Sequence, residues 1–140
     1  MDYNMLLRGE DMPEGKRDII AFPKYSNVWM HSKCREEIIR LIRPEEVPEF
    51  IAAYESRVDY LSKNMGQEIS HRTWFEVLKK SQGLRAIRFL KCHNLRILYV
   101  IENGKAYLLL AFEERKGHRN TEYSSYIEPA LNRLRERNEI

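Results

Sequence analysis

The sequence predicts an α+β domain, in which an N-terminal helical hairpin packs on a small twisted antiparallel β-sheet and a C-terminal helix follows. Three observations support this prediction. Apolar residues recur at helical spacing between residues 32 and 66. From Leu84 onward the apolar period changes to 2, which is typical of strands. The dipeptide Asn103-Gly104 indicates a tight hairpin, because a type I′ turn needs positive φ at both central residues.

The chain has 140 residues, of which 43% are hydrophobic, enough for one core. We expect residues 1–16 to form an irregular N-terminal arm and residues 17–140 to form a single domain. No apolar run reaches the roughly 18 residues that cross a bilayer, and no signal-peptide pattern is present, so we expect a cytoplasmic protein without membrane contact. Cys34 and Cys92 lack metal-type spacing; reduced thiols are expected, and one disulfide stays an alternative.

The first half of the chain is predicted to be mainly helical. A short strand is expected at Ile19–Phe22 before Pro23. A helix should begin at Ser32, which can cap it, and should end at Pro44. The longest helical pattern follows and ends at Gly66, with apolar positions at 47, 50, 51, 54, 58 and 61. Together the two helices form the predicted hairpin.

Two further helices are predicted. The stretch 70–83 fits a short third helix with Ser70 as cap and Gly83 as terminator. The C-terminal helix has Ser125 and Glu128 at the spacing of a capping box. Pro129 is tolerated if the helix begins near Ser125, and it would produce a kink if the helix begins at Thr121.

The sheet is predicted from three strands, Leu84–Leu90, Leu95–Ile101 and Ala106–Phe112. With Asn103-Gly104 as the turn, Ile101 lies opposite Ala106. Regular pairing then places Tyr99 opposite Leu108, Ile97 opposite Leu110 and Leu95 opposite Phe112. One face then carries only apolar side chains and should pack on the helices, namely Leu95, Ile97, Tyr99, Leu108, Leu110 and Phe112.

The second face of this predicted sheet gathers arginines. Arg96 lies there beside Ala111, a small residue that leaves room for a ligand, and Arg88 shares this face from the preceding strand. Arg115 joins them if the last strand continues. Clustered guanidiniums repel one another and are easiest to explain by a bound phosphate, which arginine holds with two parallel hydrogen bonds. The simpler interpretation is a surface salt bridge between Arg96 and the diagonal Glu113.

Charge is distributed unevenly along the chain. Residues 1–82 hold 13 basic and 14 acidic side chains, whereas residues 83–140 hold 11 basic and 7 acidic ones. A local positive excess favours an anionic partner such as nucleic acid, although basic residues at a sheet edge also serve solubility.

The second half of the chain resembles a known family. The segments FEVLKK, GLRAIRFLK, NLRILYVIENGKAYLLLAFEERKG, TEY and ALNRLRE run in this order from Phe75 to about Arg135. Their order and spacing are similar to the RelE/ParE toxin superfamily, closest to its phage-derived, HigB-like branch. The predicted helices, antiparallel strands and C-terminal helix also look like that RelE-like fold.

The resemblance implies the toxin of a type II toxin-antitoxin system, a ribosome-dependent mRNA endonuclease or mRNA interferase. In this family the RNA 2′-hydroxyl attacks the adjacent phosphate and leaves a cyclic phosphate, with no metal or other cofactor besides the ribosome as required context. Implied partners are the ribosome, mRNA and a cognate antitoxin, for instance a helix-turn-helix protein, in a toxin-antitoxin hetero-oligomer or with the toxin as a homodimer.

The resemblance also implies residue roles. Arg96 matches the strand arginine that contacts the scissile phosphate, and Arg88 falls where the family has a basic residue on the preceding strand. Arg115 or Lys116 follows the last strand and would stabilise the developing charge. Several members carry a lysine pair where this chain has Ala86 and Arg88. Since arginine stays protonated near neutral pH, it is a poor general base, and another residue must supply one.

Two residues are candidates for that base. His118 follows the last strand and titrates near neutrality, and Glu113 is the second candidate. Tyr123 or Tyr126 could stack on a base or donate a proton. The simpler interpretation of His118 is a solvated loop histidine, and that of Tyr126 is an anchor that holds the last helix. Further candidates for substrate contact are Lys91, Lys116 and Arg119.

Two other functions stay open at this point. A ParE-like protein of the same fold would inhibit DNA gyrase and would need no acid–base pair. A catalytically inactive, phage-related protein of the RelE fold would act by binding alone, and the missing lysine pair keeps that alternative open.

Overall fold

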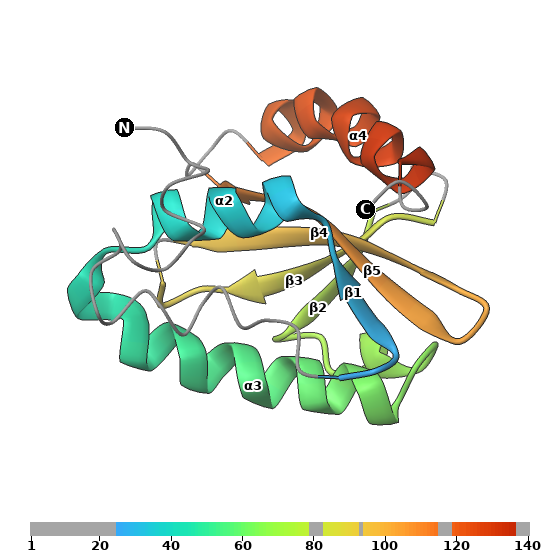
Figure 1. Ribbon diagram of the computed structural model, residues 1–140, viewed down its shortest axis with the longest axis horizontal. Helices are drawn as coiled ribbons and strands as arrows, with labels where there is room; N and C mark the ends of the chain where they lie inside the picture. Colours follow the sequence, from blue (N-terminus) through green and yellow to red (C-terminus); the bar gives the residue numbers. More distant parts are fainter. Residues whose placement is uncertain (1–24, 79–82, 93, 115–118, 137–140) are drawn as a thin grey trace.

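The computed structural model describes residues 25–78, 83–92, 94–114 and 119–136, with the side chains of the last range described from Tyr123 onward. Its elements form three layers (Figure 1), with helix α4 on one face of a five-stranded sheet and helices α2 and α3 on the other. The predicted α+β class with a C-terminal helix is therefore confirmed.

Along the chain, the elements run β1 (Val28–Met30), α2 (Ser32–Leu41), the 3-10 turn η2 (Pro44–Glu46), α3 (Val47–Lys63), the 3-10 turn η3 (Glu68–Ser70), β2 (Phe75–Val77), β3 (Arg85–Phe89), β4 (Leu95–Glu102), β5 (Lys105–Glu113) and α4 (Arg119–Arg135). Across the sheet the strand order is β1-β5-β4-β3-β2. Strand β1 is parallel to β5 and the other neighbours are antiparallel, so the sheet is mixed. The predicted three-stranded meander forms its centre, and β1 and β2 are edge strands that the prediction missed.

Helices α2 and α3 share one core with the sheet. Their apolar sides bury Ile38, Phe50 and Tyr54 against strand residues such as Tyr99. The residue that caps α2 differs from the prediction: Nδ1 of His31, not the Ser32 hydroxyl, accepts a hydrogen bond from the Lys33 amide at 3.0 Å. Helix α3 ends at Lys63, and Gly66 lies in the turn beyond it with φ of +89°.

The predicted third helix over 70–83 is wrong. Phe75–Val77 instead forms β2, where Phe75 lies opposite Ile87 and Glu76 opposite Ala86. Hydrogen bonding to the free edge of β3 outweighs the weak local helical pattern, because sheet pairing satisfies backbone groups along two segments at once. This correction matters for function, since it turns the Glu76 side chain to the α4 side of the sheet.

A β-bulge changes the predicted register of β4 and β5. Asn103 and Gly104 have φ of +53° and +74°, as a type I′ turn requires, and the pairs up to Tyr99–Leu108 are as predicted. Leu98 then pairs with Leu110, so Leu109 is an extra residue. From there on every β5 side chain is turned to the other face, and Arg96 lies opposite Phe112 rather than Ala111.

Helix α4 begins at Arg119, not at Ser125, so Pro129 lies inside the helix. It covers the sheet face that was predicted to stay open, where Ala130 and Leu131 pack with Leu98 and Phe112 in a second core. The open second face is thus a wrong prediction around β4 and β5. It failed because the bulge adds Leu110 and Phe112 to that face and makes it apolar enough to need a cover.

Some predictions concern residues outside the described ranges: the arm 1–16 and the strand Ile19–Phe22. Cys34 and Cys92 are both buried free thiols. None of the described helices combines the length and the apolar character that a bilayer-spanning helix needs.

Candidate functional site

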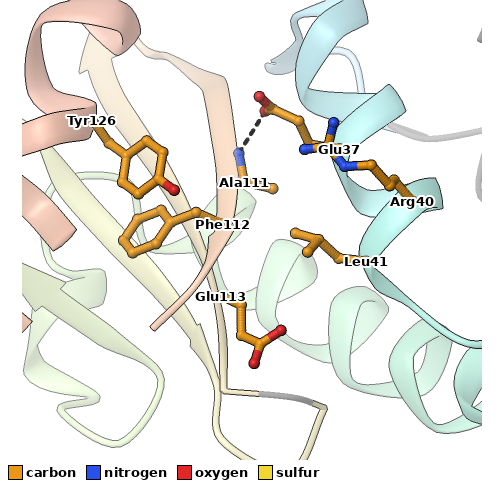
Figure 2. Close-up of a pocket in the computed structure, with 7 residues that line it drawn as sticks. All are labelled: Glu37, Arg40, Leu41, Ala111, Phe112, Glu113 and Tyr126. Carbon is orange, nitrogen blue, oxygen red and sulfur yellow. Dashed lines mark hydrogen bonds between the residues drawn. The ribbon is translucent and has the colours of Figure 1, made fainter. Parts of the chain in front are cut away.

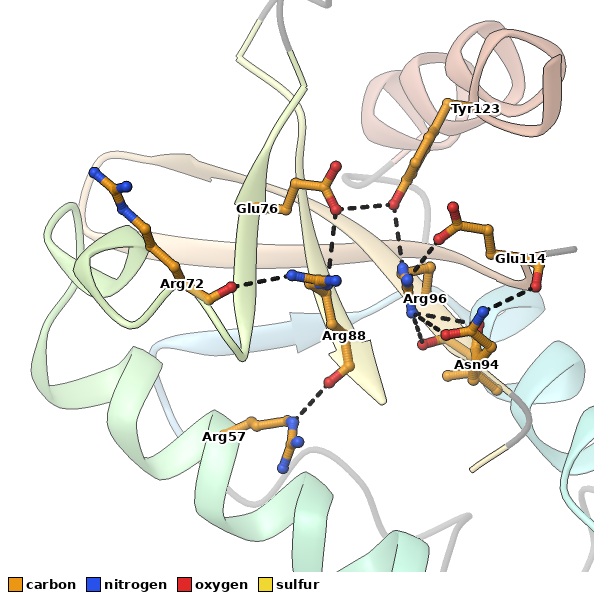
Figure 3. A network of polar contacts seen from close by, with 9 residues as sticks. Arg57, Arg72, Glu76, Arg88, Asn94, Arg96, Glu114 and Tyr123 are labelled. Atoms are coloured by element: carbon orange, nitrogen blue, oxygen red, sulfur yellow. Dashed lines mark hydrogen bonds and ion pairs between the residues drawn. The ribbon is translucent and has the colours of Figure 1, made fainter. Parts of the chain in front are cut away.

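Arg88 and Arg96 lie directly opposite each other on β3 and β4, on the face covered by α4, as the alternation of strand side chains predicts. They differ in exposure. The Arg88 side chain is 26% exposed and that of Arg96 only 4%. Figure 3 shows both within one network of polar contacts. The two guanidiniums therefore belong to one site, of which Arg96 is the inner part and Arg88 the outer part.

Arg96 is surrounded by protein partners. Its Nη2 lies 2.5 Å from Oε2 of Glu114, its Nε donates to the Tyr123 hydroxyl at 3.2 Å, and Nη1 donates to Oδ1 of Asn94 at 3.1 Å. Asn94 is held by a bond from its Nδ2 to the Glu114 carbonyl. The carboxylate was predicted to be Glu113, but the bulge turns Glu113 to the α2 side and brings Glu114 to Arg96 instead.

Glu76 joins the two arginines through Tyr123. The Tyr123 hydroxyl, which accepts from Arg96, donates to Oε2 of Glu76 at 3.2 Å, and the same oxygen lies 3.8 Å from Nε of Arg88. Glu76 comes from β2, Arg88 from β3, Arg96 from β4 and Tyr123 from α4 (Figure 3). Four elements thus bring a carboxylate, a phenol and two guanidiniums together; we call this set the Glu76 cluster.

The outer part of the cluster opens into a groove. Arg72, Glu76, Val77 and Arg88 line it. Arg88 is oriented there by a hydrogen bond from its Nη1 to the Arg72 carbonyl at 3.1 Å, and Val77 is 47% exposed at this sheet edge. An extended anionic chain could therefore reach Arg88 and Glu76 without a change in the protein, whereas Arg96 lies behind Tyr123 and Glu114.

Such a cluster has a recognisable chemistry. A carboxylate can accept a proton from a hydroxyl group, a phenol can return one to a leaving oxygen, and two guanidiniums can stabilise negative charge on a phosphate. These are the groups that a metal-independent phosphodiester transfer needs. Among the described residues, no three His, Cys, Asp or Glu side chains are grouped as a metal site would require.

Glu113 and Tyr126, two other predicted site residues, lie elsewhere. Both line a separate pocket between α2, β5 and α4, together with Arg40 and Glu37 (Figure 2). The Tyr126 ring stacks on Phe112 with ring centroids 4.3 Å apart, which fits the simpler interpretation of an anchor for the last helix. The structure thus places both residues at this pocket, whereas the Glu76 cluster lies at another groove.

The other predicted site residues fall into two groups. Arg115, Lys116 and His118 lie outside the described residues, and Arg119 begins α4 without a described side chain. Lys91 is exposed after β3 and lines a third pocket with Arg57 and Trp74. Of the ten predicted residues, then, the Glu76 cluster contains Arg88, Arg96 and Tyr123.

Sequence reasoning missed two residues of the site, Glu76 and Glu114. The segment Thr73–Val77 is rich in aromatic and β-branched residues, which favour strands, and that signal could have placed Glu76 beside Arg88. No local pattern marks Glu114, because the bulge depends on contacts made by distant residues. In comparisons with known proteins, no family model, no curated protein and no solved structure matches the chain.

Proposed function

We propose that this protein is the toxin of a type II toxin-antitoxin system, a RelE-like endoribonuclease that cuts mRNA on the ribosome without a metal ion. The observation that carries the proposal is the Glu76 cluster, which supplies a base, a proton donor and two phosphate ligands at one place. Further support comes from the order of elements, two helices, then an antiparallel meander, then a C-terminal helix, together with the sequence resemblance of 75–135.

In the proposed reaction, the Glu76 carboxylate takes the proton of an RNA 2′-hydroxyl, and that oxygen attacks the adjacent phosphorus. The bond from phosphorus to the 5′-oxygen breaks, and Tyr123 protonates the leaving oxygen. Arg88 binds the phosphate from the groove and Arg96 stabilises the charge that develops on its oxygens. The products are a 2′,3′-cyclic phosphate and a 5′-hydroxyl. Glu76 thus fills the role for which His118 and Glu113 were the sequence candidates.

This mechanism demands a movement near Arg96. The ion pair with Glu114 and the hydrogen bond to Tyr123 occupy its guanidinium, and the side chain is only 4% exposed. A phosphate must therefore take the place of the Glu114 carboxylate at Arg96. At Arg96 the exchange replaces one charge-assisted contact by another, and the displaced Glu114 carboxylate, which is 9% exposed, must turn toward water because a buried charge without a partner is costly.

The test is induced expression of the wild type and of Glu76→Gln, with growth and mRNA 5′-ends as readouts. Glutamine has nearly the shape of glutamate but cannot act as a base, so cleavage should fall by about 10²–10⁴-fold. We expect growth arrest and new 5′-ends with the wild type, and neither with the variant. Glu113→Gln is the matched control, because this exposed carboxylate faces α2, and it should remain as active as the wild type.

Equal cleavage by the wild type and Glu76→Gln would contradict the proposal, provided that both proteins show the same melting temperature. DNA breaks that depend on gyrase, without new mRNA ends, would indicate the ParE-like function instead.

A second candidate function is a catalytically inactive RelE-fold protein that acts by binding. The observation that favours it is the near-complete burial of Arg96 in its ion pair with Glu114. Under this alternative, induction of the wild type leaves growth and mRNA ends unchanged, and Glu114→Gln changes stability alone.

A further inference from the structure

Arg57 differs from four other arginines that are at least partly buried. Arg85, Arg88, Arg96 and Arg133 each lie beside a carboxylate, respectively Glu68, Glu76, Glu114 and Glu37. Within the described parts of the chain, Arg57 forms no ion pair. Its Nε donates to the Arg88 carbonyl at 2.8 Å and its Nη1 to the Ala53 carbonyl at 3.3 Å. These neutral acceptors leave its positive charge uncompensated.

Two aromatic rings hold the Arg57 guanidinium in place. Its central carbon lies 4.9 Å from the Trp74 ring centre and 5.1 Å from that of Phe89. Trp74 in turn stacks on His71, with ring centroids 3.9 Å apart. Burial lowers the pKa of Arg57, which shows that the surroundings disfavour an unpaired charge there. A guanidinium held rigidly and left without a counter-charge is prepared for an anion.

Arg57 lines an open pocket that carries a second cation. Lys91, exposed after β3, and Leu90, 46% exposed, lie at the same pocket with Thr73 and Trp74. Glu49 also lines it but forms no ion pair with Arg57. The ligand that fits is an anion with apolar surface beside it, as a nucleotide of a single strand offers through its phosphate and its base.

The Arg57 pocket adjoins the groove of the Glu76 cluster. Arg72 lines the groove, and the next two residues, Thr73 and Trp74, line the Arg57 pocket. Residues of both sites bind Arg88. The Arg88 side chain donates to the Arg72 carbonyl and the Arg88 amide donates to the Trp74 carbonyl, while Arg57 donates to the Arg88 carbonyl. A strand bound at Arg88 can therefore continue over the turn at Arg72–Trp74 into the Arg57 pocket.

We propose that Arg57 and Lys91 form a second phosphate site, which binds a phosphodiester of single-stranded RNA next to the one held by Arg88. This inference rests on the proposed function, because it assigns part of the same RNA path. The site binds the strand and takes no part in bond cleavage. It is separate from the sheet face around Arg96, since it lies where α3 and the end of β3 meet.

The test is the salt dependence of binding to a labelled 2′-O-methyl oligoribonucleotide, which cannot be cleaved because its 2′-oxygens are blocked. Affinity falls as salt concentration rises, and each lost phosphate contact should make the slope of log affinity against log salt concentration less steep by about 0.7. We expect this change, with several-fold weaker binding, in Lys91→Ala and in Arg57→Gln. Lys63→Ala is the control, since this lysine on α3 is 71% exposed and lies outside the pocket; its slope should equal that of the wild type.

Unchanged slopes in both pocket variants would overturn the proposal, as would an equal change in Lys63→Ala. Because Lys91 is exposed, its variant remains informative if Arg57→Gln fails to fold. Inorganic phosphate serves as a competitor at constant ionic strength, and we expect it to weaken oligonucleotide binding more in the wild type than in Arg57→Gln. Phosphate that binds the wild type through Arg57 without weakening oligonucleotide binding would indicate a site for free phosphate and overturn the RNA assignment. If Glu76→Gln loses cleavage but the pocket variants keep the salt slope of the wild type, only the second phosphate site is rejected. If the pocket variants change the slope but Glu76→Gln cleaves like the wild type, only the proposed function is rejected.

Discussion

Arg96 illustrates how burial decides the meaning of a single charged residue. Its position on β4 follows from strand alternation, but its partners come from β5 and α4. The carboxylate of Glu114 and the hydroxyl of Tyr123 neutralise and orient it, so it contributes to the stability of the fold as well as to the proposed chemistry. Loss of one member of such a buried pair leaves the other charge uncompensated, which is costly.

His31 is the residue for which a pH dependence is expected. Its Nδ1 accepts the bond that caps α2 and its Nε2 lies 3.5 Å from Glu136, so the cap needs the neutral ring. Burial, followed by the charge of Arg133, lowers the pKa of His31 below its usual 6.5. Just below pH 6.5 the unfolded chain therefore binds more protons than the folded one, and stability falls as pH falls.

Between pH 7.5 and 5.5 we expect the free energy of unfolding to drop more in the wild type than in His31→Asn, because asparagine caps a helix without titrating. Urea unfolding at both pH values measures this difference. The same pH dependence in the two proteins would show that the His31 cap does not control it.

Among the elements, α4 depends on contacts at both of its halves. Tyr123 fixes the first half to β2 and β4, and Arg133 fixes the second. The Arg133 guanidinium donates to both carboxylate oxygens of Glu37 at 2.7 and 2.8 Å and to the Leu109 carbonyl at 2.9 Å. Glu37 in turn accepts from the Ala111 amide at 3.0 Å. The backbone groups of the bulge are thus satisfied by the ion pair that joins α2 to α4.

Arg133→Met should therefore destabilise the protein by roughly 3 kcal/mol, because it leaves the partly buried Glu37 without its counter-charge. Arg135→Met is the control on the same helix, since its pair with Glu128 is exposed, and such surface pairs contribute at most about 1 kcal/mol. Urea unfolding gives both values, and hydrogen exchange of the α4 amides shows whether the helix is released. Similar losses in the two variants would mean that Arg133 does not anchor α4.

At the scale of the whole molecule, one sheet is shared by two cores. Phe50 belongs to the core under α2 and α3, and Leu98 belongs to the core under α4. Strands β4 and β5 contribute side chains to both, so neither core can be lost while the other keeps its sheet. The fold should behave as one cooperative unit.

Phe50→Ala and Leu98→Ala should each cost about 3 kcal/mol, since both side chains have no exposed surface. The two variants should still unfold in a single transition when it is followed by far-ultraviolet circular dichroism and by tryptophan fluorescence, as Trp29 packs on the α4 side and Trp74 on the α3 side. Separate transitions for the two signals in either variant would show that the cores unfold independently.

Local patterns in the sequence were sufficient for the helices before Gly66, the three central strands and the turn at Asn103-Gly104. Each of these depends on a short period or on backbone preferences that neighbouring residues express by themselves. That Arg88 and Arg96 share one face of the sheet followed from the same alternation. Only the tertiary structure decided that Phe75–Val77 is a strand, that Leu109 is a bulge and that α4 covers the second face. These features arise from hydrogen bonds and buried area between segments far apart in the chain, and they decide that Glu76 and Glu114, rather than Glu113, lie beside the arginines.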